Sequence, residues 1–214
     1  MKKATWLSAL CLFGVLFCAA PVGHAASPPI SYTPLQQQDI QQAKEKTKQA
    51  IANWDNGAGT RSDASVTGAI GAPGEILVTL DGTSSGSSAW AGGHAAVVSD
   101  VAGYTVESFG NKGDLNGVRH WVNDWSTRYT KVKGLRVQGA TGADYSYAAS
   151  YNRQQIGKPY NYNFFNVTTT SSFYCSQLVW RAYYNRGYDL NDGLAVWPVD
   201  LIESPLTYEF YSQG

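Results

Sequence analysis

Residues 171–184 read SSFYCSQLVWRAYY, and this stretch decides the fold. Apolar residues within it recur at the spacing of one helical face, and Gly187 follows as a stop signal. The pattern predicts a helix over about 174–185. Cys175 then falls in the first turn, at the end where backbone N–H groups have no partner within the helix.

The position of Cys175 bears on its chemistry. Ser171 or Ser172 is the expected cap, and the unpaired N–H groups together with the positive end of the helix dipole favour a thiolate over a thiol. The same N–H groups could stabilise an oxyanion. The alternative is a small residue packed in the core, because free cysteine is among the most buried residue types. A base close to Cys175 would separate the two interpretations.

Residues 1–25 have the composition of a secretory signal peptide. Two lysines are followed by an apolar run over 6–20 and then by small residues in GHAAS. A retained membrane helix is less consistent with this pattern, because the run is shorter than the roughly 20 residues that a span needs. We therefore expect an exported protein without a stable membrane span. Cys11 and Cys18 would leave with the signal, so that Cys175 is the single remaining thiol and no intramolecular disulfide can form.

The remaining residues suit one domain with a sizeable core. Residues 26–65 contain a proline-rich linker and a Gln- and Lys-rich helical segment, which we interpret as an extension, and residues 66–214 form the predicted catalytic domain. Loss of the two signal lysines takes the formal charge from zero to about minus two. No basic patch indicates a nucleic-acid partner.

In the domain, the predicted strands come first and the predicted helices follow. The loop over 81–93 is rich in Gly and Ser, and the sequence does not decide whether it acts as a lid. Taken together, the segments predict an α+β fold in which an antiparallel sheet packs against the helix that carries the cysteine. The predicted strands are GEILVTL (74–80), HAAVVSD (94–100), YTVESFG (104–110) and KVKGLRV (131–137); GVRHWVNDWSTRY (117–129) is ambiguous, residues 143–157 are helical, and Asp200 is expected to cap a short terminal helix.

Two histidines remain after residue 25, and one of them is the better candidate for a base. His94 begins a strand directly after two glycines, whereas His120 lies in VRHWV and has the surroundings of an ordinary strand residue. Glu107 follows His94 by thirteen residues, in the next strand. A hairpin centred between residues 100 and 101 sets Glu107 opposite His94, and another register shifts the pair by up to about three residues. Glu107 could then fix the tautomer of His94, or it could be a solvated strand carboxylate.

These residues resemble a known family. GKPYNYN (157–163) followed by SSFYCSQLVWRAY resembles the cysteine block of the NlpC-type papain-fold hydrolases, and PGEILVTL, GGHAAVV and VES resemble their histidine block. The order of the two blocks is reversed here, since His94 precedes Cys175 by 81 residues. This reversal is similar to the circularly permuted branch, the YiiX-like or YycO-like hydrolases.

The resemblance implies a circularly permuted papain-like (NlpC-type) fold and a role for each site residue. Cys175 would be the nucleophile, His94 the base, Glu107 its orienter, and Tyr160 would line the substrate site near the nucleophile. Neither a metal nor a cofactor is required, and one cysteine with two histidines makes a poor zinc set.

Three kinds of function remain open at this point. The first is an exported cysteine hydrolase that cleaves amide bonds, with peptide stems of the cell wall as the expected substrate. The second is an amidase, esterase or acyltransferase that acts on lipid or other acyl substrates. The third is a catalytically silent wall-binding module whose Tyr and Trp side chains stack on sugars. An intact set of Cys175, His94 and Glu107 argues against the third.

Overall fold

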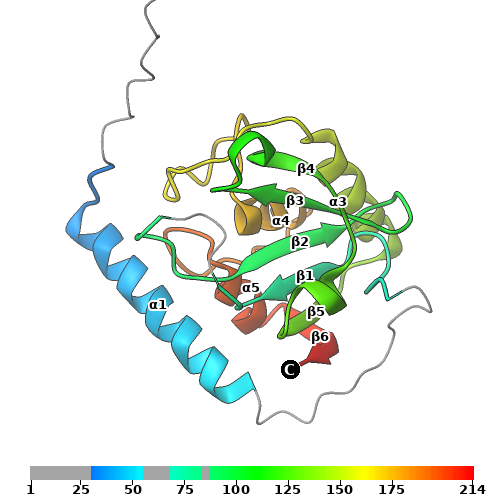
Figure 1. Ribbon diagram of the computed structural model, residues 1–214, viewed down its shortest axis with the longest axis horizontal. Coiled ribbons are helices and arrows are strands. Elements are labelled where there is room, and N and C mark those ends of the chain that lie inside the picture. Colours follow the sequence, from blue (N-terminus) through cyan, green and yellow to red (C-terminus); the bar gives the residue numbers. More distant parts are fainter. Residues whose placement is uncertain (1–29, 55–67, 83–86) are drawn as a thin grey trace, which may run out of the picture. The chain divides into compact units, whose positions relative to one another are not determined.

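A computed structural model describes residues 30–54, 68–82 and 87–214, of which Ser31–Gly214 form one compact unit (Figure 1). The predicted signal peptide, the segment 55–67 and part of the loop over 81–93 lie outside the described residues. The elements, in chain order, are α1 (Pro34–Trp54), β1 (Ile76–Thr79), β2 (His94–Val98), β3 (Tyr104–Phe109), η1 (Gly113–Leu115), β4 (Gly117–Val122), α2 (Trp125–Arg128), β5 (Val132–Val137), α3 (Gly142–Gln154), α4 (Cys175–Tyr184), α5 (Pro198–Glu203) and β6 (Thr207–Gln213).

The strands form one antiparallel sheet in the order β4-β3-β2-β1-β5-β6. Strands β1 and β2 lie near its centre and are buried along their whole length, which explains their continuous apolar runs. The edge strand β6 was not predicted from the sequence. It pairs with β5 across an irregularity between Gly134 and Leu135, and it buries too few residues to leave an apolar pattern.

The ambiguous segment 117–129 divides into a strand and a short helix. Its first half forms β4, which pairs with β3 along six residues. The side chain of Asn123 then leaves the ladder and donates to the backbone oxygen of Ile70 at 2.8 Å. The chain turns there into α2, a single helical turn that begins at Trp125. A segment that contains both a strand and a helical turn within thirteen residues shows neither the hydrophobic period of a strand nor that of a helix clearly.

Helix α4 packs on strands β2 and β3, behind the sheet in the view of Figure 1, and α3 packs on α4. The helix begins at Cys175 with Tyr174 as its cap, so the expected cap at Ser171 or Ser172 is wrong. The chain before it is held by a hydrogen bond from the N–H of Phe173 to the oxygen of Pro159 at 3.1 Å. Gln177 Oε1 accepts the N–H of Tyr174 at 3.2 Å, which is the role of a residue at the third helical position.

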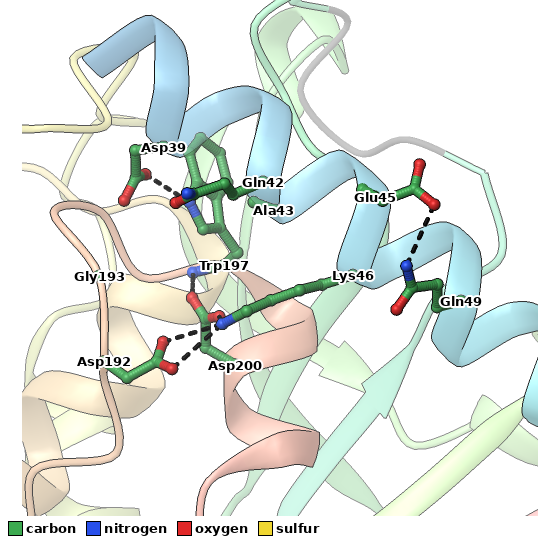
Figure 2. A pocket seen from close by; sticks show the side chains of 10 residues that line it. All are labelled: Asp39, Gln42, Ala43, Glu45, Lys46, Gln49, Asp192, Gly193, Trp197 and Asp200. Atoms are coloured by element: carbon green, nitrogen blue, oxygen red, sulfur yellow. Dashed lines mark hydrogen bonds and ion pairs between the residues drawn. The ribbon is translucent and has the colours of Figure 1, made fainter. Parts of the chain in front are cut away.

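Helix α1 is mostly polar, but one stripe of it is buried in the core shared with the sheet and α4. It contacts α5 around a cavity of about 450 Å³ that is shown in Figure 2. Asp39 accepts the indole N–H of Trp197 at 2.9 Å, and Lys46 Nζ lies 3.1 Å from Asp192 and 3.4 Å from Asp200. These contacts attach α1 to the segment that runs into α5.

Asp200 is not the first cap residue of the terminal helix, contrary to the prediction from the sequence: α5 begins at Pro198 with Trp197 as its cap, and Asp200 lies at the third helical position. From there its carboxylate accepts the N–H of Trp197 at 2.9 Å, which completes a capping box. Burial raises the pKa of Asp200 to about 6, although the Trp197 N–H and Lys46 oppose this change.

Among the described residues, no helix is long and apolar enough to cross a bilayer.

Candidate active site

The side chains of His94 and Glu107 meet inside the domain. His94 Nε2 lies 2.7 Å from Glu107 Oε2, and both residues are almost completely buried. In the ladder, Glu107 is opposite Ala96, so the hairpin centre lies one residue later than the first register considered. Ala96 and His94 point to the same face because side chains alternate along a strand. Glu107 is therefore a diagonal neighbour of His94, a distance that a glutamate side chain can span.

Cys175 completes the group from the first turn of α4, where it is fully buried. Burial alone would lower the pKa of His94, but the charges of Cys175 and Glu107 and their hydrogen bonding raise that pKa to about 9. Because Glu107 binds Nε2, proton exchange with the thiol falls to Nδ1, which has no hydrogen bond of ordinary geometry among the described residues. The arrangement favours an imidazolium facing a thiolate at a helix N-terminus.

The second oxygen of Glu107 is held by three donors. Oε1 accepts from Thr105 Oγ1 at 2.6 Å, from Trp125 Nε1 at 3.0 Å and from Arg128 Nη2 at 2.6 Å. Burial would raise the pKa of Glu107, but His94 and Arg128 lower it to about 2. The carboxylate is therefore ionised throughout the physiological range, and its other oxygen, Oε2, pairs with His94.

Sequence reasoning did not find the three residues that hold Glu107. Trp125 and Arg128 come from α2, inside the segment whose structure was ambiguous. Their spacing of three residues, which brings two side chains to one side of a helical turn, was the available signal. Thr105 precedes Glu107 by two residues in the same strand and so shares its face.

Aromatic rings surround His94 and restrict its orientation. It stacks on Phe109 at 5.1 Å between ring centroids and on Trp125 at 5.7 Å, and Tyr129 lies at 6.4 Å. Burial, together with the negative charges of Glu107 and Cys175, raises the pKa of the Tyr129 phenol. Tyr129 is therefore neutral at physiological pH.

Two further residues were considered from the sequence, Tyr160 as a substrate contact and His120 as an alternative base. Tyr160 is buried in the same core cluster as Cys175 and forms an isolated parallel bridge with Phe173, two residues before the cysteine. His120 lies on β4, where its Nε2 is 2.9 Å from Ser99 Oγ. Its ring centroid lies 5.5 Å from that of Tyr104, and burial lowers the pKa of His120.

A cavity of about 300 Å³ reaches His94 from the surface. Cys175 is not among its lining residues, so a substrate that enters here meets His94 first. The larger cavity of Figure 2 contains none of the four candidate site residues and belongs to the attachment of α1. No group of three or more metal-ligating acids, histidines or cysteines was found in the described part of the chain. The lining residues of the cavity beside His94 are Asp81, His94, Phe109, Gly110, Asn111, Lys112, Arg128 and Tyr129.

Comparison with known families agrees with this geometry. Residues 90–192 match the family model described as permuted papain-like amidase enzyme, YaeF/YiiX, C92 family. This part of the chain belongs to the permuted papain-like amidases. The predicted α+β permuted papain-like fold and the assignment as a cysteine hydrolase are thereby confirmed. The matched range of this amidase domain includes Cys175, His94, Glu107 and Tyr160. Neither the curated proteins nor the solved structures gave a match to the chain.

Proposed function

We propose that this permuted papain-like amidase is exported and cleaves amide bonds in cell-wall peptide stems, with Cys175 as nucleophile, His94 as proton carrier and Glu107 as orienter. The observation that carries the proposal is the buried hydrogen bond between His94 and Glu107, in a group where the charges and hydrogen bonding of Cys175 and Glu107 outweigh burial and raise the pKa of His94 to about 9. A structural histidine needs neither partner, whereas an acyl-transfer site needs both.

In the proposed reaction, the Cys175 thiolate attacks the carbonyl carbon and forms a C–S bond. The backbone N–H groups in the first turn of α4 stabilise the negative charge that develops on the carbonyl oxygen. The proton on Nδ1 of His94 passes to the leaving amine as the C–N bond breaks. Water then attacks the acyl-enzyme with His94 as general base, which releases the acid and restores the thiolate.

Glu107 supports the same proposal without changing its own protonation state. Its Oε2 accepts the Nε2 proton of His94, so that Nδ1 is always the nitrogen that exchanges protons. Thr105, Trp125 and Arg128 prevent the carboxylate from rotating, since they occupy its other oxygen. Tyr160 is proposed to line the acyl side of the site, next to the strand-like segment at Phe173 that leads into α4.

The test compares the purified wild type with Cys175→Ala on purified cell walls and on N-acyl amides of lipid type. We expect release of peptide fragments from cell walls by the wild type alone. Release by both proteins to the same extent would contradict the hydrolase assignment for that substrate. Cleavage of the lipid-type amides alone would retain the mechanism and replace the substrate.

The two histidines provide a matched control for the mechanism. We expect His94→Ala to abolish hydrolysis and to slow alkylation of Cys175 below pH 8, where an ordinary thiol with a pKa of about 8.5 is protonated. His120→Ala, which removes a histidine outside this site, is expected to retain both activities. Equal behaviour of the two variants would exclude His94 as the proton carrier.

A further inference from the structure

We propose that the cavity beside His94 binds a carboxylate group of the substrate, and that Lys112 selects for it. This inference rests on the proposed function, since it concerns which amides reach Cys175. It assigns to the cavity a chemical class of ligand, an amide that carries one negative charge close to the scissile bond.

The charge of the cavity wall favours an anion. Three of its lining side chains are cationic when His94 is protonated, namely His94, Lys112 and Arg128, and one is anionic, Asp81. These charges act across a partly enclosed space, in which they are screened less than on an open surface.

Lys112 differs from Arg128 because its charge is not paired with a carboxylate of the described residues and can pair with one of a ligand. Arg128 is engaged by Glu107 at 2.6 Å and by Asp124 at 3.1 Å. Lys112 forms no ion pair with any carboxylate in the described part of the chain, and its ammonium instead lies 4.9 Å from the ring centroid of Phe109 and 5.1 Å from that of Trp121. These rings hold the ammonium beside the cavity without neutralising it.

The position of Lys112 relates it directly to the proposed base. Phe109, whose ring lies beneath the ammonium of Lys112, also stacks on the imidazole of His94. A carboxylate bound to Lys112 therefore lies one aromatic ring away from the nitrogen atoms that would move the proton. A ligand that spans this distance can pair with Lys112 while its amide reaches the Cys175 side of His94.

Asp81 sets the orientation of the bound group. Its Oδ2 accepts from the backbone N–H and hydroxyl group of Thr130 and from the N–H of Lys131, at 2.6, 2.8 and 2.9 Å. These bonds fix the carboxylate of Asp81 in the wall of the cavity. There its negative charge repels the carboxylate of the substrate. The substrate carboxylate is therefore expected on the Lys112 side.

The test uses two alkylating reagents that differ in charge and attack Cys175 by the same chemistry. Iodoacetate carries a carboxylate, and iodoacetamide carries a neutral amide in its place. The measurement is the ratio of their rate constants at low salt for the wild type, Lys112→Met and Lys112→Arg, with Lys48→Met as the control. Lys48 lies on α1 with a largely exposed side chain and is not part of the cavity, so its loss makes the same change in net charge.

We expect Lys112→Met to lower the ratio of iodoacetate to iodoacetamide rates by about threefold to tenfold, the effect of one charge at short range in a wet site. Lys112→Arg should restore most of the ratio, and Lys48→Met should leave it at the wild-type value. An unchanged ratio in Lys112→Met, or an equal decrease in Lys48→Met, would overturn the subsite. If Cys175 reacts with both reagents no faster than in the unfolded protein, the proposed function itself fails.

Discussion

Arg128 Nη2 lies 2.6 Å from Glu107 Oε1, the carboxylate oxygen that does not face His94. Arg128 thus shares with Thr105 and Trp125 the role of holding the carboxylate of Glu107 in its orientation toward His94. A guanidinium is suited to this position because it is always charged and its planar donors hold a carboxylate in a fixed orientation.

The first prediction concerns Arg128 as a positioning residue. Arg128→Met should lower kcat by about tenfold, because Glu107 loses one of the three donors that orient it. It should also lower the free energy of unfolding by about 3 kcal/mol, since a buried carboxylate loses its cation. Steady-state kinetics and urea denaturation give the two values.

Arg136 provides the matched control for this variant. It pairs with Glu75 at 2.5 Å, also with a largely buried carboxylate, but lines no part of the site described above. Arg136→Met should lower stability and leave kcat close to the wild-type value. A similar fall in kcat in both variants would argue that Arg128 acts only through stability.

The second prediction uses the raised pKa of His94. Acylation needs a proton on His94, so kcat/KM should fall on the alkaline side at about pH 9, the pKa of His94 in this site. Glu107→Gln removes the negative charge that stabilises the imidazolium, so the pKa of His94 decreases and the alkaline limb moves to lower pH. The measurement is the pH profile of amide hydrolysis by both proteins, and an unmoved alkaline limb would contradict the role of Glu107.

The third prediction concerns the glycine before His94. Gly93 has a φ of 80°, and a Cβ at this position would lie 2.5 Å from the backbone oxygen of Thr79. Gly93→Ala should therefore destabilise the protein by about 3 kcal/mol or more and displace His94. Gly103 has a φ of 79° with nothing within 4 Å of the added Cβ, so Gly103→Ala should cost only about 1 kcal/mol. Equal losses in denaturation experiments would show that the close contact is unimportant.

The fourth prediction uses Asp200, whose pKa burial raises to about 6. Between its ordinary value near 3.8 and pH 6, the folded protein binds more protons than the unfolded chain, so this group lowers stability as pH rises. Asp200→Asn retains an acceptor for the Trp197 N–H and removes the titration. The stability of the variant relative to wild type should therefore increase by about 2–3 kcal/mol from pH 4 to pH 7.

Urea denaturation at several pH values measures this difference. Lys46 and Asp192 also face the carboxylate of Asp200, and Lys46→Met serves as a second variant because it removes the opposing charge. A difference in stability between wild type and Asp200→Asn that is constant with pH would contradict the raised pKa.

The parts of the fold that follow from local patterns were predictable from the sequence. The apolar runs of β1 and β2, the hairpin to β3 and the helix that begins at Cys175 are each contained in a short, continuous stretch of the chain. Strand β6 and the turn α2 were not, because their structure depends on pairing with β5 and on burial of Trp125.

In the site too, residues that belong to one short segment could be predicted, and residues that meet them from a distant segment could not. Cys175, His94 and Glu107 are recognisable from their positions in a helix and a hairpin. The residues that hold Glu107 come largely from a segment 18 to 21 residues further along the chain, at Trp125 and Arg128. The cap at Tyr174 was missed for a local reason, since tyrosine is not a common cap residue and two serines precede it.

The order of the three residues along the chain has a consequence for biosynthesis. His94 and Glu107 lie on adjoining strands and can meet after a short hairpin has formed, whereas Cys175 arrives from 81 residues further on. A ribosome therefore releases the acid–base pair well before the thiol. A nascent chain that ends before residue 175 can already form the hairpin of His94 and Glu107, but it lacks the cysteine that we propose as the nucleophile.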